Sequence, residues 1–191
     1  MKPILFSRPT HHTQKAEVSQ IFFYILALIT FAVILIFGYQ SITDFMAKGE
    51  RVSFITFKTD LERTVQRVTP DYGSVVVYDA QHPFTVPGAY TRLCFIDMDK
   101  SPPSSCALLL NPIICDAWQT SAPSGWSHAE ATVFTEPQGT VPIKVARITA
   151  DTNGNHREDD GDKGYLCFPT ISHRLDIRFE GRGDHTFVSQ P

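Results

Sequence analysis

The longest run of potential metal ligands in this sequence lies between Asp151 and Asp162. Asp151, Asn153, Asn155 and Asp159 present oxygen atoms at nearly alternating positions. Carboxylate and amide oxygens are the ligands that Ca²⁺ takes, about six to eight of them. The spacing therefore predicts a calcium site, and calcium is the one cofactor that the sequence indicates. A stretch rich in Asp, Asn and Gly is also typical of an exposed turn, and that alternative stays open.

Two further patterns bear on catalysis. Ser127 precedes His128, the residue types of a nucleophile and its base. Neighbours in sequence seldom form a catalytic pair, however, and no G-x-S-x-G turn surrounds the serine. Asp97 and Asp99 would share one face of a strand as paired carboxylates, yet they also fit a strand end that enters a turn at residues 100–105. We therefore expect a protein that is not an enzyme.

The four cysteines are Cys94, Cys106, Cys115 and Cys167. Their spacing contains no C-x-x-C or Cys/His pattern typical of zinc. Cys94 and Cys167 each stand between a leucine and a phenylalanine, which suits neighbouring strands and leaves Cys106 to pair with Cys115. Two disulfides in an oxidising compartment are one interpretation, and four free cysteines in an apolar core are the other.

Trp118 and Trp126 lie in a region rich in Pro and Ser, which predicts loops. Exposed aromatic rings in loops can stack on a sugar or a protein partner, whereas buried ones complete a core. Both tryptophans are therefore candidate binding residues, with burial as the alternative.

Residues 18–43 form a stretch of 26 residues without a charge, and residues 21–39 are its apolar centre. A helix of roughly 20 apolar residues crosses a bilayer core of about 30 Å. A cleaved secretory signal would have a shorter apolar region and a small-x-small cleavage site, and a core helix would show a polar stripe. We therefore interpret this stretch as a retained transmembrane helix.

The charges are divided unequally about this helix. Three of the 17 basic residues but only one of the 20 acidic residues precede Asp44. The basic flank predicts a cytoplasmic N-terminus and an extracellular C-terminal domain. Nucleic-acid binding usually needs a clustered basic surface, so we expect no nucleic-acid partner for this acidic domain.

Beyond the membrane stretch, apolar residues recur every three or four positions and predict that the helix continues as an amphipathic one. Pro70 and Gly73 end this pattern. The stripe consists of Phe54, Phe57, Leu61, Val65 and Val68. From Tyr72 on, short apolar and β-branched runs between turn residues predict strands, at residues 75–78, 92–96, 107–110, 132–134, 143–148 and 171–180.

The predicted fold class is therefore α+β, with a long N-terminal helix, first transmembrane and then amphipathic, packed on an antiparallel β-sheet head domain. The boundaries are a basic cytoplasmic leader at residues 1–16, the helix at residues 17–69 and a β-rich extracytoplasmic head at residues 70–191. Alternating residues of the 171–180 run predict a sheet with one buried face, for which the amphipathic helix is the natural cover.

This order of a short basic leader, an apolar helix that continues as an amphipathic one and a disulfide-bearing sheet resembles the type IV pilin-like superfamily, especially its small archaeal members. In that family a prepilin-type peptidase removes the leader before the apolar helix. The sequence Lys15-Ala16-Glu17 looks like that junction, so the resemblance implies a cut between Ala16 and Glu17. Bacterial members usually carry a glycine at the position of Ala16 and a glutamate at that of Ile21, and this chain departs from both.

The resemblance implies a structural subunit, major or minor, of a surface filament or secretion pseudopilus. It would associate with itself or with other pilin-like subunits through residues 21–37 and be anchored in the cell membrane. The alternative is a single-pass tethered module that binds a carbohydrate or protein ligand and does not polymerise. An N-terminus at Glu17 in the mature protein would favour the first function, and an intact Met1 the second.

Overall fold

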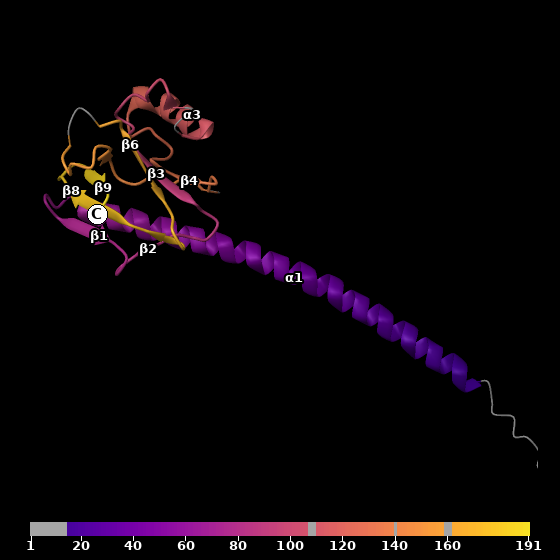
Figure 1. Cartoon of the computed structure of the whole chain (residues 1–191). Coiled ribbons are helices and arrows are strands. Elements are labelled where there is room, and N and C mark those ends of the chain that lie inside the picture. Colours follow the sequence, from indigo (N-terminus) through magenta and orange to yellow (C-terminus); the bar gives the residue numbers. More distant parts are fainter. Residues whose placement is uncertain (1–14, 107–109, 140, 159–161) are drawn as a thin grey trace, which may run out of the picture. The chain divides into compact units, whose positions relative to one another are not determined.

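The computed structural model of the protein describes residues 15–106, 110–139, 141–158 and 162–191 (Figure 1). The chain divides into two compact units, Met1–Lys48 and Gly49–Pro191, and each is described by itself. Helix α1, Lys15–Val68, contributes residues to both. Among the described residues, short strands form three sheets, so the fold is of the predicted α+β class.

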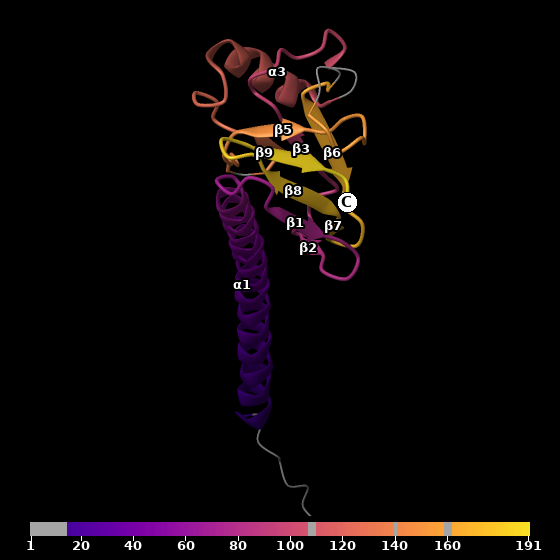
Figure 2. The same cartoon turned by 90° about the vertical axis from the view of Figure 1, so that its left-hand side faces the viewer.

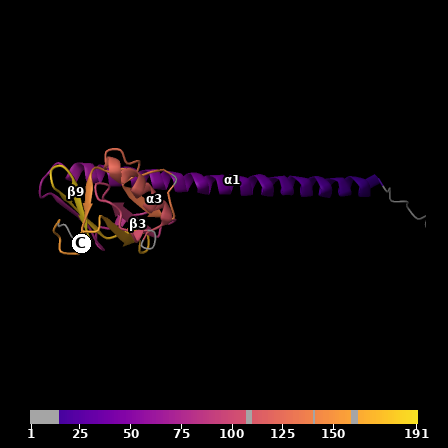
Figure 3. The same cartoon turned by 90° about the horizontal axis from the view of Figure 1, so that it is seen from above.

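Within the first unit, α1 is exposed on every side. Each side chain from residue 21 to residue 46 is solvent-accessible, and this part of α1 contains the one helix window among the described residues that is long and apolar enough to cross a membrane. The hydroxyl of Thr30 donates to the carbonyl of Leu26 at 2.8 Å, so the helix satisfies this polar group internally. Figure 3 shows the N-terminal part of α1, coloured indigo, as a coiled ribbon.

Within the second unit, α1 is amphipathic as predicted. All five members of the predicted stripe are buried in the main hydrophobic core, which they form together with residues of the sheets. The opposite side carries exposed charges such as the ion pair of Asp60 with Arg63. The helix ends at Val68, and the hydroxyl of Thr69 then donates to the carbonyl of Val65 at 2.7 Å.

The largest sheet has four strands in the order β1-β8-β9-β5 (Figure 2). Strand β5 runs parallel to β9, while the other neighbours are antiparallel. The prediction of a purely antiparallel sheet is therefore wrong at this edge, since a parallel neighbour far away in sequence leaves no local signal. The strands are β1 at Val75–Tyr78, β5 at Ile148–Ala150, β8 at Ile177–Gly181 and β9 at Thr186–Ser189.

Two smaller antiparallel sheets complete the second unit. One has the order β4-β3-β6 and the other pairs β2 with β7. Their bounds are β2 at Phe84–Thr85, β3 at Arg92–Ile96, β4 at Val133–Glu136, β6 at Tyr165–Pro169 and β7 at Arg174–Leu175.

Strand β3 is buried on both faces. Leu93 and Phe95 belong to the core that α1 lines, whereas Cys94 and Ile96 belong to a second core cluster. Because side chains alternate between the faces of a strand, this sheet separates two apolar layers. The continuous apolar sequence of β3 follows from this position.

The second cluster is covered by helix α3, Pro112–Ser121, which is followed by the short helix η1, Ala122–Ser124. The prediction of a loop is therefore wrong at Trp118, which lies in α3, but it is confirmed at Trp126, which lies in a turn after η1. The side chain of Asn111 caps α3 by accepting from the backbone N–H of Ile113 at 3.0 Å, and Pro112 occupies the first turn, where its missing N–H costs nothing. Ile114, Cys115 and Trp118 form the buried face.

The strand predicted at residues 171–180 is interrupted in the structure. Ser172 and His173 both have positive φ, at 50° and 63°, and Ile171 and Arg174 exchange two backbone hydrogen bonds across them. This geometry is a tight hairpin turn, after which β7 and β8 follow as separate strands. Apolar and polar residues still alternate after the turn, where Ile177 and Phe179 are buried. The sequence pattern therefore gives no sign that the strand is interrupted.

The structure differs from the prediction, or does not describe the residues, at three other predicted strands. Strand β4 covers residues 133–136 rather than 132–134. Of residues 143–148, only Ile148 belongs to a strand, while Ile143 makes an isolated bridge to Val133. Residues 107–109 lie outside the described residues, and Leu110 is not in a strand.

Candidate functional site

The four cysteines form two disulfides in the second unit. Cys94 on β3 lies directly opposite Cys167 on β6, with their Cα atoms 4.0 Å apart. Cys106 bonds Cys115 on α3, with a Cα separation of 5.9 Å. This is the pairing that the flanking residues of Cys94 and Cys167 favour. The first bond joins two strands of one sheet, and the second ties the segment before α3 to the helix.

The apolar part of α1 is the largest exposed apolar surface among the described residues. Large apolar side chains from Ile21 to Phe37 are each about half exposed or more, and monomeric soluble proteins rarely expose so large a patch. The predicted processing residues Ala16 and Glu17 lie in the first turn of α1.

The two candidate tryptophans occupy different environments. Trp118 is fully buried on α3, and its indole N–H donates to the carbonyl of Lys100 at 2.8 Å. It therefore has no accessible ring face for a ligand, and the core alternative holds for it. Trp126 is half-buried against the same cluster, and the ammonium of Lys144 lies 5.8 Å from its ring centroid. Trp126 alone retains an accessible ring.

The carboxylate of Asp151 organises the loop that was predicted to bind calcium. Asp151 is buried, and its Oδ1 accepts the backbone N–H groups of Asn153 at 3.1 Å and of Gly154 at 2.7 Å. Its Oδ2 accepts the N–H of His156 at 2.8 Å. Three backbone donors thus converge on one carboxylate, which fixes the turn.

Two other predicted calcium ligands also hydrogen-bond within the loop. The side-chain amide of Asn153 donates to the carboxylate of Asp162 at 3.4 Å, and the side chain of Asn155 accepts from the N–H of Arg157 at 2.8 Å. Asp162 is not one of the predicted ligands; its buried carboxylate also accepts from the N–H of Thr152 at 3.0 Å. Asp159 lies outside the described residues. Within the part of the chain that the structure describes, no group of three His, Cys, Asp or Glu residues is arranged to hold a metal. Calcium binding remains a prediction.

Ser127 and His128 do lie within hydrogen-bond distance. The hydroxyl of Ser127 is 3.0 Å from Nδ1 of His128, and the same nitrogen is 3.0 Å from the carbonyl of Ser124. A carbonyl only accepts, so this hydrogen bond requires the proton to be on Nδ1. A protonated nitrogen cannot take the serine's proton.

A charged network that sequence reasoning missed connects distant segments of the second unit. Arg147 donates through Nε to Asp99 at 2.6 Å and through a terminal nitrogen to Asp184 at 3.0 Å. Asp184 in turn contacts Nδ1 of His185, whose Nε2 lies 2.8 Å from Glu158. The hydrogen bond from His185 holds the pKa of Asp184 below its ordinary value. The network ties the end of β3 to the β8–β9 connection and to the Asp151 loop.

Asp97 lies next to this network and differs from Asp99. It is only 3% exposed, and its Oδ1 accepts the backbone N–H of Asp99 at 3.0 Å. Burial raises the pKa of Asp97 to about 6, against the lowering effect of that hydrogen bond. Asp99 is meanwhile held by Arg147 and by the N–H of Trp126. The two carboxylates therefore shape the turn after β3.

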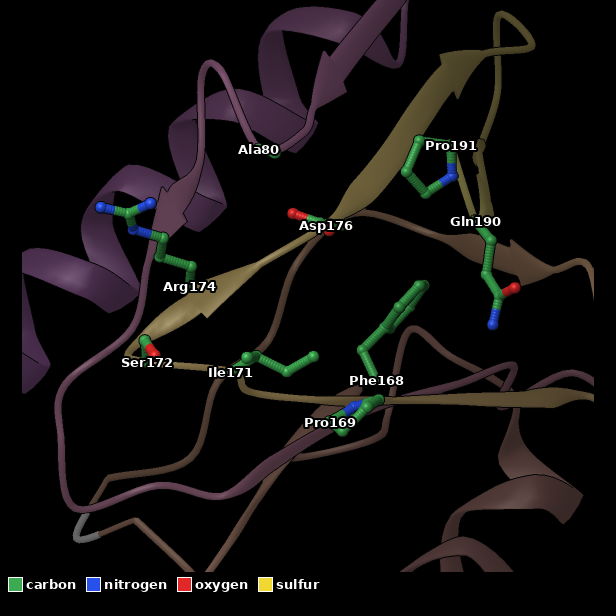
Figure 4. Close-up of a pocket in the computed structure, with 9 residues that line it drawn as sticks. All are labelled: Ala80, Phe168, Pro169, Ile171, Ser172, Arg174, Asp176, Gln190 and Pro191. Carbon is green, nitrogen blue, oxygen red and sulfur yellow. The ribbon is translucent and has the colours of Figure 1, made fainter.

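An open groove of about 490 Å³ lies where the ends of several strands meet (Figure 4). Ile171, which is 71% exposed, points toward Phe168, while the guanidinium of Arg174 points away from both. The groove thus has an apolar centre and polar groups at its margins. Its lining residues are Ala80, Phe168, Pro169, Ile171, Ser172, Arg174, Asp176, Gln190 and Pro191.

Sequence reasoning could not find this groove. Its residues come from the segment after β1, from β6, from the hairpin turn, from β7 and from the segment after β9, so only the folded sheets bring them together. The exposed isoleucine in a tight turn, Ile171, is the one local signal.

Comparison of the chain with protein-family models, with curated proteins and with solved structures gives no match.

Proposed function

We propose that this chain is a pilin-like structural subunit that a transmembrane helix holds in the cell membrane. The observation that carries the proposal is the change in α1 along its length. Apolar side chains are exposed on every side from Ile21 to Phe37, whereas only one stripe is apolar and buried beyond Gly49. A membrane helix that becomes the core helix of a β-rich domain has this composition.

The exposed apolar side chains favour any environment that keeps them away from water, in the bilayer or in an assembly. Burying apolar surface contributes about 25 cal/mol per Å², and lipid tails or neighbouring helices can supply the burial. A subunit that leaves the bilayer would exchange lipid contacts for contacts with the same residues of other subunits. Residues 21–37 are therefore the proposed assembly surface.

The remaining features fit this arrangement. A basic leader favours the cytoplasmic side, and the two disulfides of the second unit suit an oxidising exterior. A prepilin-type peptidase would cut between Ala16 and Glu17.

The test is the N-terminus of the mature protein, read by mass spectrometry from purified membranes and from sheared cell-surface filaments. We expect a chain that begins at Glu17 in both fractions. An Ala16→Phe variant, which places a bulky side chain before the cut, should keep its leader and be missing from the filaments. An intact Met1 in the filaments, or filaments that lack the chain, would reject the proposal.

The groove of Figure 4 favours a second candidate, a tethered module that binds a carbohydrate or protein ligand. Its test uses the full chain in detergent micelles on glycan and peptide arrays. If the groove binds, Ile171→Asp should weaken the signal at least tenfold, whereas Ile113→Asp, at an exposed apolar position of α3, should not. Equal binding by both variants, or no binding by the native chain, would reject this function.

A further inference from the structure

An open pocket of about 350 Å³ lies between the end of α1 and the strands β1 and β2. It shares no lining residue with the groove of Figure 4, and all of its lining residues belong to the second unit. The side chains that bear on its chemistry are Arg63, Thr64 and Arg67 of α1, Tyr78 of β1, and Phe84 and Thr85 of β2.

The pocket carries one positive charge in excess. Arg63 and Arg67 are four residues apart on α1, so their side chains are neighbours on one face of the helix, where like charges repel. Asp60 is the one acidic residue of the lining. It lies 3.5 Å from Arg63 in a pair whose side chains are both more than half exposed, so water screens this attraction. Arg67 forms no ion pair with a described residue.

Helix stability accounts for only one of the two arginines. Arg67 lies in the last turn of α1, where a positive charge favours the helix dipole, whereas Arg63 lies one turn earlier. Two arginines against one carboxylate also differ from the balance of the domain, in which acidic residues outnumber basic ones. A negatively charged ligand accounts for both arginines.

Hydroxyl groups supply a further donor at the same place. The hydroxyl of Thr64, a residue that is only 7% exposed, lies 3.2 Å from that of Tyr78. One of two paired hydroxyls donates and the other accepts, so one O–H proton of the pair is left for another acceptor. Neither hydroxyl has a second hydrogen-bond partner among the described residues. The pocket is therefore richer in donors than in acceptors.

We propose that this pocket binds a tetrahedral oxyanion, phosphate or sulfate, as the free ion or as the ester of a sugar. Guanidinium groups donate paired N–H groups to the oxygens of such anions, and the hydroxyl pair adds a donor between the helix and β1. A carboxylate has two oxygens in one plane and would use fewer of these donors. The inference goes beyond the proposed function and does not rest on it.

The pocket also has room for a small organic group beside the anion. Its volume is at the lower end of the range of about 300 to 1,000 Å³ that small-ligand pockets have, and it exceeds the volume of a single oxyanion. The rings of Tyr78 and Phe84, whose centroids are 4.9 Å apart, supply an apolar wall for the carbon atoms of an ester.

Calorimetric titration of the full chain in detergent micelles tests the site. The probes are sodium phosphate, sodium sulfate, glucose 6-phosphate and glucose, with sodium chloride holding the ionic strength constant so that diffuse attraction is screened equally. We expect saturable one-to-one binding of the anions and none of glucose. Binding of glucose 6-phosphate at least tenfold tighter than that of phosphate would assign the site to an ester, and equal or weaker binding would assign it to the free ion.

Single substitutions locate the binding. Arg67→Gln removes the guanidinium that has no ion pair and should weaken phosphate binding at least tenfold, and Arg63→Gln should do the same. Arg51→Gln is the matched control, since Arg51 is an exposed arginine of the same helix outside the pocket, and it should keep the native affinity within twofold. Tyr78→Phe keeps the ring but removes the hydroxyl, and it should weaken binding about threefold.

Thermal melts of the four variants establish that each is folded before it is titrated. Equal affinities of the Arg67→Gln and Arg51→Gln chains would overturn the proposal. So would heats that sodium chloride alone reproduces at the same ionic strength, or the absence of saturable binding of both phosphate and sulfate.

Discussion

Two stretches of one helix have different surroundings. From residue 21 to residue 46, α1 is apolar on nearly all sides and exposed throughout, whereas beyond Gly49 it buries one stripe against its own sheets. Helix propensity alone does not distinguish them, because leucine, isoleucine and phenylalanine occur in both. The width of the apolar surface does, since a stripe suits a water-facing domain and an all-round surface suits lipid.

The difference also predicts where stability resides. The second unit has two core clusters and two disulfides of its own, so its folding should not require a membrane. In the first unit, by contrast, the apolar stretch of α1 that is long enough to cross a membrane is not buried against any other part of the described chain. Substitutions in the two stretches should therefore have separable effects.

The largest expected effect comes from the disulfide between β3 and β6. Its bond closes a segment with a separation of 73 residues, against 9 for the bond between Cys106 and Cys115. By loop-closure entropy, replacing Cys94 and Cys167 together by alanine should lower the free energy of unfolding by about 4 kcal/mol, and replacing the second pair by about 2.5 kcal/mol. Denaturant titration of the full chain in micelles measures both. The opposite order would contradict this account of the second unit.

Leu61→Ala tests the buried stripe and should cost about 3 kcal/mol, because it leaves a cavity among the residues that α1 packs on the sheets. Leu28→Ala is the matched control, on the same helix but 69% exposed, and should change the unfolding of the second unit by less than about 0.5 kcal/mol. Similar losses from both variants would remove the distinction between the two stretches.

The sequence predicts this helix well because its signals are local. The spacing from Phe54 to Val68 marks the buried face, and Pro70 and Gly73 mark the end. Strands β1 and β3 have the predicted bounds, since both are β-branched or apolar runs between turn residues. The pairing of Cys94 with Cys167 is also anticipated by neighbours that suit facing strands.

Features that depend on distant contacts are missed. The parallel pairing of β5 with β9 and the groove around Ile171 join segments that share no local pattern. Helix α3 is a different failure, because Asn111 and Pro112 are a recognisable helix start. The surrounding Pro and Ser residues, which are typical of loops, obscure that signal.

The stability of the second unit should depend on pH through Asp97. Burial raises the pKa of Asp97 to about 6 from an ordinary value near 3.8, so the folded state binds this proton more tightly than the unfolded state. The resulting stabilisation is present below pH 3.8 and is lost as pH rises through 6. Asp97→Asn keeps the oxygen that accepts from Asp99 but cannot ionise. The free energy of unfolding of this variant should exceed that of the native chain by on the order of 2 kcal/mol more at pH 7 than at pH 4.

Thermal melts of both proteins from pH 4 to pH 7 measure this difference, with exposed Asp176→Asn as the control. A gap between native and Asp97→Asn melting temperatures that does not widen with pH would contradict a buried, destabilising charge at Asp97.

The smallest effect is expected at the Asp151 loop. Asp151→Ala removes the acceptor of three backbone N–H groups and should cost about 1 to 2 kcal/mol. Thermal melts with calcium and with a chelator separate this structural role from metal binding. Equal losses under both conditions would assign the carboxylate to the turn, whereas a chelator effect that Asp151→Ala abolishes would establish the calcium site.

Protease treatment of intact cells tests the membrane assignment most directly. With tags at both ends, mass spectrometry of the membrane fraction should show a protected fragment that ends soon after Asp44, while C-terminal fragments appear outside the cell. A chain that is cut beyond Asp44 only after the membrane is permeabilised, or a soluble chain with residues 21–39 intact, would contradict an anchored helix that carries an extracellular domain.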